Sequence, residues 1–254
     1  MSIETYGSGE RLRIAAGLLL GWELSGHLVL LPVPSTRDGI HVTGCDAEIC
    51  EVLSSADENT VIVGYSIPRD ASPLALSRGA RVLDLSTDEK YILENARLTA
   101  LGCLGYLLGS EKRAISECSV GIVGYGRIGS ALTELLCFLG ARVKVYTSRE
   151  STRNYLCSLG IESALRDELN FDTENSIDIL INTAPCDLSA ELSAGATALG
   201  FRIIELASGK NLEGVSGVEY LPSLPEKMYP KSAARAYAEA VKRYLKADKE
   251  GDVK

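Results

Sequence analysis

The sequence predicts an α/β protein with two parallel sheets, each flanked by helices. Three observations lead to this prediction. Short apolar runs alternate with helical segments along the whole chain, the order that parallel sheets with crossover helices require. The 254 residues, 46% of them hydrophobic, are enough to bury two cores. A glycine-rich turn joins an apolar run to a helix near the middle of the chain.

The first third of the chain predicts the smaller sheet from three apolar runs and three short helical segments. The strands are His27–Val33, Thr60–Tyr65 and Arg81–Leu85, and the helices are Glu10–Leu20, Asp46–Ser54 and Ser72–Arg78. A longer helix follows from about Thr87 to Leu108. Asp88 and Glu89 in its first turn suit the positive end of a helix. A helix of this length is a natural connector between two domains.

The rest of the chain predicts the larger sheet and a returning helix. The strands are Ser119–Val123, Arg142–Tyr146, Ile177–Ile181, Arg202–Leu206 and Val218–Leu221, and the helices are Arg127–Leu139 and Ser151–Leu159. A last helix, Lys231–Ala247, carries Ala, Tyr and Val on one face and is expected to pack on the first domain. The expected domains are therefore residues 1–94 with the returning segment 225–250, and residues 95–224.

The glycine-rich turn is the most specific motif of the chain. It reads Gly124, Tyr125, Gly126, Arg127, Ile128, Gly129. Because it follows a strand and opens a helix, Gly124 would permit a tight turn and Gly126 would let the backbone approach a pyrophosphate. Gly129 would let the helix pack closely on the strand. The motif predicts a doubly wound (Rossmann) sheet that binds NAD(P). A glycine-bearing turn without a ligand is the alternative.

The end of the next strand indicates which dinucleotide is preferred. An NAD site usually places Asp or Glu there, on the ribose hydroxyls. The chain has Thr147, Ser148 and Arg149, with Arg153 close behind. Hydroxyl and guanidinium groups suit a 2′-phosphate, so NADP is favoured and NAD is the alternative. A solvated Arg at an exposed helix start would explain the pattern without a ligand.

Two further strand ends are expected in the same crevice, because ligands bind at the carboxyl ends of such sheets. The residues that follow these strands are Asn182, Thr183, Ala184, Pro185, Leu206, Ala207 and Ser208. The first four are expected beside the ribose and the nicotinamide. Either segment could instead be an ordinary turn.

Charge and composition argue against several other functions. With 34 acidic and 26 basic residues the formal charge is −8. The sequence contains no run of basic residues, so nucleic acid is not an expected partner. The apolar run Ile14–Trp22 is too short to span a membrane. Seven irregularly spaced Cys and only two His predict no metal site. The odd number and irregular spacing of the Cys residues and an N-terminus unlike a signal peptide suggest the cytoplasm.

Segments spread over the whole chain also resemble a known family. They are Leu30–Ile40, Asp88–Asn95, Gly124–Gly129, Asn182–Pro185, Leu206–Ser208, Leu224–Pro225 and Pro230–Ala233. In order and spacing they resemble the A subunit of dipicolinate synthase from endospore-forming bacteria. The resemblance implies an architecture akin to D-2-hydroxyacid dehydrogenases, with a flavodoxin-like N-terminal domain. It implies oxidation of a dihydrodipicolinate-type ring to dipicolinate during sporulation, and the flavoprotein-like B subunit of that enzyme as partner. A homo-oligomer is also expected.

The chain departs from this family at several positions near the expected substrate cleft. The family's glycine–aspartate turn is shortened to the segment Gly7–Glu10. Leu98, Thr99 and Leu101 stand where the family usually has Pro, Thr and Glu, and Glu226 and Ala234 replace family glycines. These departures bear on the substrate more than on the cofactor.

The implied reaction is driven by aromatisation of the ring. It needs an oriented nicotinamide for hydride transfer, a proton acceptor and cations for two carboxylates of the substrate. Arg37 and Lys231 flank family-like motifs and are the candidates for this dicarboxylate, with Arg97 and Lys227 as weaker ones. Solvated surface cations are the alternative reading, and the proton acceptor is unknown.

Two other functions stay open. A D-2-hydroxyacid dehydrogenase needs a His with a carboxylate behind it and an Arg for the substrate carboxylate. Both His27 and His41 precede the glycine loop, and Glu205 lies in the strand-end segment where that family carries its Arg. The absence of these groups also fits a non-catalytic protein that binds NADP and stabilises a partner.

Overall fold

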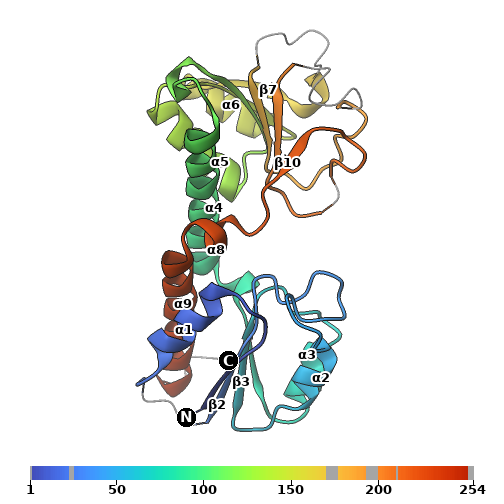
Figure 1. The fold of residues 1–254 in the computed structure, drawn as a ribbon, viewed down its shortest axis with the longest axis vertical. Coiled ribbons are helices and arrows are strands. Elements are labelled where there is room, and N and C mark those ends of the chain that lie inside the picture. Colours follow the sequence, from blue (N-terminus) through green and yellow to red (C-terminus); the bar gives the residue numbers. More distant parts are fainter. Residues whose placement is uncertain (1, 23–25, 170–176, 193–199, 210, 251–254) are drawn as a thin grey trace. The chain divides into compact units, whose positions relative to one another are not determined.

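The computed structural model describes residues 2–22, 26–169, 177–192, 200–209 and 211–250, without side chains for 248–250. The chain divides into two compact units (Figure 1). Unit 1 comprises Met1–Leu98 and Pro225–Lys254, and unit 2 comprises Thr99–Leu224. Every described strand pair in both units is parallel, which confirms the predicted α/β class.

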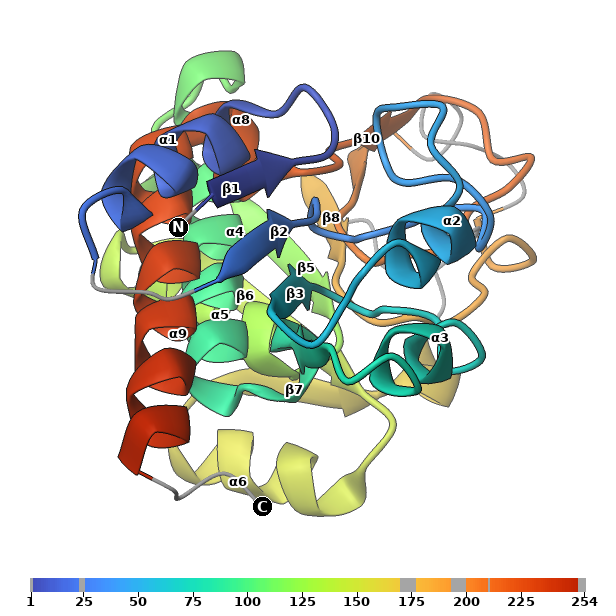
Figure 2. The same ribbon diagram turned by 90° about the horizontal axis from the view of Figure 1, so that it is seen from below.

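Unit 1 is a sheet of four strands in the order β1-β2-β3-β4. The strands are β1 (Ser2–Thr5), β2 (His27–Leu30), β3 (Thr60–Gly64) and β4 (Arg81–Asp84). The helices on one face are α1 (Glu10–Leu19) and α9 (Pro230–Glu250), and those on the other are α2 (Ile49–Ser54) and α3 (Ser72–Leu76) (Figure 2). The last helix therefore packs on the first sheet, as its apolar face predicts.

Alternating side chains of the central strands supply both cores of unit 1. Leu28 and Leu30 face α1 and α9, whereas Val29 faces α2 and α3, and all three are buried. This alternation follows from the two-residue period of a strand. The hydroxyl of Tyr237 in α9 lies 3.0 Å from the carbonyl oxygens of Leu31 and of Val63, to which it donates, and so fixes α9 on the sheet.

The first crossover of unit 1 differs from the next two. All three connections step in the same direction across the sheet, yet α1 lies on the opposite face from α2 and α3. The crossover through α1 therefore has the opposite hand to the others. This order and helix placement are those of a flavodoxin-like sheet, 2-1-3-4-5, that lacks its second strand.

Unit 2 is a sheet of six strands in the order β10-β9-β8-β5-β6-β7. The strands are β5 (Ser119–Val123), β6 (Arg142–Thr147), β7 (Glu162–Leu165), β8 (Ile179–Asn182), β9 (Arg202–Glu205) and β10 (Val218–Tyr220). This is the Rossmann order, with the direction of the strand sequence reversing between β5 and β8. The predicted Rossmann fold of this part of the chain is confirmed.

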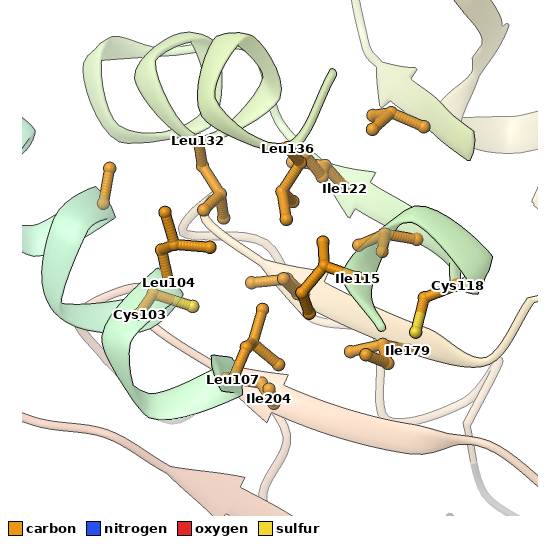
Figure 3. Close-up of a cluster of buried hydrophobic side chains, with 14 of the residues drawn as sticks. Cys103, Leu104, Leu107, Ile115, Cys118, Ile122, Leu132, Leu136, Ile179 and Ile204 are labelled. Carbon is orange, nitrogen blue, oxygen red and sulfur yellow. The ribbon is translucent and has the colours of Figure 1, made fainter. Parts of the chain in front are cut away.

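One face of this sheet is covered by α5 (Arg127–Phe138), α6 (Glu150–Ser158) and part of α4 (Glu89–Ser110). Figure 3 shows Cys103, Leu104 and Leu107 of α4 among the buried side chains of this core, with Leu132 and Leu136 of α5. Burial raises the pKa of the Cys103 thiol to about 12, so this cysteine packs as a small apolar residue. All seven cysteines are free.

The remaining described elements are short. They are α8 (Leu224–Met228) and three 3-10 turns, η1 (Leu85–Thr87), η2 (Ile115–Glu117) and η3 (Arg166–Glu168). The start of α4 is capped by Asp88, whose carboxylate accepts from the backbone N–H of Tyr91 at 2.9 Å. The same carboxylate pairs with Arg243 of α9 at 2.7 Å. The cap explains why α4 begins at Glu89, two residues after the predicted start.

Candidate dinucleotide-binding site

A pocket lies at the carboxyl edge of the unit 2 sheet, beside the point where the strand order reverses. Its lining residues come from the ends of β5, β6, β7 and β8 and from the first turn of α6. They are Val123, Gly124, Tyr125, Gly126, Tyr146, Thr147, Ser148, Arg149, Thr152, Arg166, Thr183, Ala184, Pro185 and Cys186. Ligand crevices of doubly wound sheets form at this position.

Two glycines of the fingerprint are required by the fold itself. Gly124 has a φ of +95°, a left-handed conformation that favours glycine, and a Cβ there would lie 2.9 Å from the Thr183 hydroxyl oxygen. A Cβ on Gly129 would overlap the carbonyl oxygen of Gly124. The Thr183 hydroxyl donates to the Val123 carbonyl at 2.9 Å and so ties the β8 loop to this turn.

Gly126 differs from the other two glycines of the motif. Its φ of −85° is ordinary for any residue, and a Cβ built on it meets no atom within 4 Å. Neither the backbone nor the packing of the protein therefore requires glycine here. Because Gly126 lines the pocket, a side chain at this position would compete with a ligand that approaches the backbone closely.

The helix that follows presents uncapped backbone donors. Gly126 is the N-cap of α5, no side chain caps this end, and the first turn carries no acidic residue. The first N–H groups of a helix have no partner inside the helix, and the helix dipole favours negative charge at this end. The start of α5 is thus suited to an anion such as a pyrophosphate.

The end of the pocket at β6 and β7 is basic and hydroxylated. Thr147, Ser148 and Arg149 line it, as the sequence predicts for a cofactor site, and the structure adds Thr152 and Arg166. No Asp or Glu occurs among the described residues that line the pocket. Within the described ranges, neither Arg149 nor Arg166 forms an ion pair. The pocket therefore carries positive charge in a chain whose formal charge is −8.

Arg153, which the sequence places in the same cofactor site, does not line the pocket. Its guanidinium group lies 3.4 Å from a carboxylate oxygen of Glu150 and 3.6 Å from one of Glu168. The pair with Glu150 lies within α6, and the pair with Glu168 connects α6 with turn η3. The contact of Arg153 with the cofactor stays a prediction. In the structure its guanidinium group already has two carboxylate partners within unit 2.

Asn182 supports the pocket from behind. It is fully buried, and its amide nitrogen donates to both carboxylate oxygens of Glu205, at 3.2 and 2.9 Å. Its amide oxygen accepts from the backbone N–H of Ala184 at 3.1 Å, which holds the pocket-lining loop. Glu205 also accepts from the backbone N–H of Ala207 at 2.7 Å. Burial raises the pKa of Glu205, and these hydrogen bonds act in the opposite direction.

The other residues predicted to bind the cofactor do not line this pocket. Leu206, Ala207 and Ser208 follow β9 at the same edge of the sheet, and the carbonyl of Ser208 accepts from the Asn211 side chain at 3.3 Å. Arg127 and Ile128 form the first turn of α5, directly after the lining residue Gly126. Their contacts with a cofactor stay predictions.

The two predicted substrate cations belong to unit 1. Arg37 is exposed in the loop that follows β2, and Lys231 is exposed in the first turn of α9. The family departures at Leu98 and Ala234 are buried, and Ala234 packs through α9 into the core of unit 1. In the part of the chain that the structure describes, no cluster of three His, Cys, Asp or Glu residues could hold a metal ion.

The structure adds lining residues that the sequence did not identify: Val123, Tyr146, Thr152, Arg166 and Cys186. Arg166 is the most informative of these. It follows β7, a strand that the sequence does not predict because its four residues alternate weakly and none is fully buried. Recognition of that strand would have placed Arg166 at the same sheet edge as Ser148. Among the described helices, none is long and apolar enough to cross a membrane.

No protein-family model and no curated protein matches this sequence. Solved structures do match it. The A subunit of dipicolinate synthase from Bacillus halodurans is similar with a TM-score of 0.76 at 18% identity, covering 96% of this chain and 97% of that one. The corresponding protein from Bacillus subtilis gives a TM-score of 0.75 at 19% identity, with 99% and 97% coverage.

A more distant structure shares the architecture. The NAD-complexed D-isomer-specific 2-hydroxyacid dehydrogenase from Lactobacillus delbrueckii ssp. bulgaricus gives a TM-score of 0.52 at 13% identity, with 100% and 98% coverage. At such identities the likeness shows the fold. The chain has the fold of the dipicolinate synthase A subunit, shared with related dehydrogenases, which confirms at this level the resemblance inferred from the dispersed segments.

Proposed function

We propose that this chain is an NAD(P)-dependent oxidoreductase that binds the cofactor pyrophosphate at the Gly124–Gly129 turn. The observation that carries the proposal is Gly126, a glycine that the protein's own backbone and packing do not need. The uncapped start of α5 supplies donors for an anion directly beside it.

The described residues fit a nicotinamide dinucleotide along the pocket. The pyrophosphate would lie at the start of α5, the adenosine ribose at Thr147–Arg149, and the nicotinamide ribose at Thr183–Pro185. When bound, the nicotinamide supplies hydride transfer. The protein's part is to orient the cofactor and to exclude water from its reactive face. Because no described carboxylate lines the ribose end, NADP is preferred over NAD.

The reaction we propose is oxidation of a dihydrodipicolinate-type ring to dipicolinate during sporulation, in the cytoplasm. A hydride leaves the ring for the nicotinamide and a proton leaves for a base, so two hydrogens are lost as the ring becomes aromatic. Support comes from the dispersed family-like segments and from the fold shared with the A subunit of dipicolinate synthase. The flavoprotein-like B subunit as partner, together with a homo-oligomeric assembly, belongs to the same proposal.

Arg37 and Lys231 are the proposed contacts for the two carboxylates of the substrate. A cation in a partly dry site binds a carboxylate more strongly than a cation in bulk water does. Arg37→Ala or Lys231→Ala should weaken dipicolinate binding roughly tenfold or more, about 1.4 kcal/mol, while cofactor binding stays nearly unchanged. Titration of dipicolinate into the NADP-loaded protein measures this effect. Wild-type affinity in both variants would show that these cations are surface residues.

A non-catalytic NADP-binding protein that stabilises a partner is the second candidate function, and the histidines favour it. His27 and His41 both lie in unit 1, where they contact the carboxylates of Glu4 and Asp38 at 3.2 and 2.8 Å. No histidine belongs to unit 2. The position that would carry the Arg of a D-2-hydroxyacid dehydrogenase lies beside Glu205, which is bound to Asn182.

Turnover separates the two candidates. The purified chain, alone and with the flavoprotein-like partner, is given NADP⁺ and a dihydrodipicolinate-type substrate, and absorbance of the reduced nicotinamide is followed. Substrate-dependent reduction that falls in Gly126→Val when NADP⁺ is limiting is the expected result. Cofactor binding without any reduction, with or without the partner, would favour the non-catalytic role.

A further inference from the structure

Arg166 reaches the β6 edge of the pocket through strand pairing, although helix α6 and strand β7 separate it from Ser148 along the chain. Strands β6 and β7 are paired in parallel with Thr147 opposite Leu165. The residues that follow, Ser148 and Arg166, therefore leave the sheet side by side at the same edge, about 4.8 Å apart in the strand-pairing direction. Both line the pocket, as does Arg149.

The two arginines at this edge are available to a ligand. Arg149 and Arg166 are both exposed, and neither forms an ion pair with any residue that the structure describes. The hydroxyl side chains that line the pocket beside them are those of Thr147, Ser148 and Thr152, and no carboxylate is among the described lining residues. Two neighbouring guanidinium groups repel each other, so an anion placed between them removes an unfavourable interaction and adds charge-assisted hydrogen bonds.

The chemistry of this subsite matches a phosphate monoester. In a doubly wound sheet the adenosine ribose lies at the end of the second strand, which is β6 here. A group on the ribose 2′ oxygen is then directed toward the edge where β6 and β7 end. A phosphate monoester carries between one and two negative charges near neutral pH and three acceptor oxygens, which suit two guanidinium groups and nearby hydroxyls. A free ribose hydroxyl offers no comparable charge.

We propose that Arg166 and Arg149 together form the subsite for the 2′-phosphate of NADP, and that Arg166 is a specificity-determining residue. The proposal rests on the proposed cofactor site and adds a residue that follows β7, the edge strand of the sheet. It also changes the role of Arg153. Because Arg153 pairs with Glu168, and Glu168 accepts from the backbone N–H of Leu165 at 2.9 Å, Arg153 positions turn η3. It acts through Glu168 and does not touch the phosphate.

Calorimetric titration of NADP⁺ and NAD⁺ into the full-length protein tests the proposal. The variants are Arg166→Ala and Arg149→Ala, with Arg142→Ala as the matched control. Arg142 is an exposed arginine at the opposite end of β6, so its removal changes the net charge equally without touching the pocket. Each pocket variant should weaken NADP⁺ binding at least tenfold and NAD⁺ binding less than twofold. Arg142→Ala should change neither affinity.

Lysine at position 166 gives a second check that does not depend on loss of a side chain. Arg166→Lys should recover part of the NADP⁺ affinity, because it keeps the charge and loses the two-pronged geometry. For the positioning role, Arg153→Ala should reduce the ratio of NADP⁺ to NAD⁺ affinity by less than Arg166→Ala does, and Arg153→Lys should restore it.

The outcomes separate this proposal from the one on which it rests. Wild-type protein that binds NAD⁺ as tightly as NADP⁺, or Arg166→Ala that weakens both cofactors equally, would overturn the 2′-phosphate subsite and leave the dinucleotide site standing. Wild-type protein that binds neither cofactor would overturn the dinucleotide site itself.

Discussion

Each unit begins with the same local arrangement, a parallel strand that leads through a glycine to a helix. The two units differ in what lies beside the glycine at the start of that helix. In unit 1 the N-cap of α1 is Gly9, and a Cβ there would overlap the carboxylate of Glu226. In unit 2 the N-cap of α5 is Gly126, and a Cβ there meets nothing within 4 Å. One glycine makes room for the protein's own carboxylate, and the other faces an open pocket.

Several backbone donors at the carboxyl edge of the unit 1 sheet are satisfied by side chains of unit 1. The Asp84 carboxylate accepts from the backbone N–H groups of Ser66, Ile67 and Ser86, at 2.9, 3.0 and 2.9 Å. The Ser35 hydroxyl oxygen accepts from the N–H of Tyr65 at 2.8 Å. The comparison teaches that in the same strand–glycine–helix connection the space beside the glycine can be filled by the protein's own carboxylate or left open to a ligand.

The largest effect should follow from Gly129→Val, which tests whether the unit 2 turn depends on this close approach. The new Cβ would overlap the Gly124 carbonyl oxygen, a backbone atom that cannot move without opening the turn. Overpacking of this kind costs about 3 kcal/mol. Chemical denaturation measures it as a lower midpoint for the unit 2 transition. Wild-type stability would mean that helix α5 and strand β5 are packed less closely than described.

A smaller loss is expected from Asp84→Ala, which removes the internal acceptor from the edge of unit 1. Three backbone N–H groups lose their partner, and Ser66, whose φ is +54°, loses the contact that holds its left-handed conformation. The expected destabilisation is about 2 kcal/mol, read from urea denaturation. Cofactor affinity should not change, because every affected residue belongs to unit 1. Equal losses of stability and of cofactor affinity would contradict the separation of the two edges.

The smallest effect concerns Glu205, the buried carboxylate behind the unit 2 pocket. Burial raises its pKa in the folded protein, so its contribution to stability is fully present below the ordinary carboxyl pKa and is lost as pH rises through the raised value. Wild-type protein should therefore lose stability relative to Glu205→Gln as the pH rises above about 4.5. Thermal melts of both proteins across this range test the sign. A difference that is independent of pH would show that Glu205 has no raised pKa.

Much of the fold could be predicted because its signals are local. Apolar runs predict most strands to within a few residues, and the turn at Gly124–Gly129 predicts the Rossmann sheet. Strands β1 and β7 could not be predicted, because edge strands of four residues with exposed positions have no clear pattern. The topology of unit 1 likewise depends on which face α1 covers, and the sequence does not show that.

The candidate site was harder to predict than the fold. Sequence proximity suggested that Arg153 would join Arg149, whereas the structure pairs Arg153 with two glutamates and brings Arg166 to the pocket. Asn182, whose contact with the cofactor stays a prediction, is buried and holds the pocket-lining loop through Ala184. Arg166 reaches the pocket because β6 pairs with β7, and Asn182 is held by Glu205. Both contacts join residues far apart in the sequence, so no local pattern predicts them.

The measurement that tests the account most directly is NADP⁺ binding by Gly126→Val, compared with wild type and with Gly109→Val. Gly109 belongs to unit 2, has open space around its Cβ position and does not line the pocket, so the same substitution there is a matched control. Both variants should fold with nearly wild-type denaturation midpoints. We expect Gly126→Val to weaken NADP⁺ binding at least tenfold, about 1.4 kcal/mol, and Gly109→Val to leave it unchanged. Wild-type affinity in a folded Gly126→Val protein would contradict a dinucleotide at this turn.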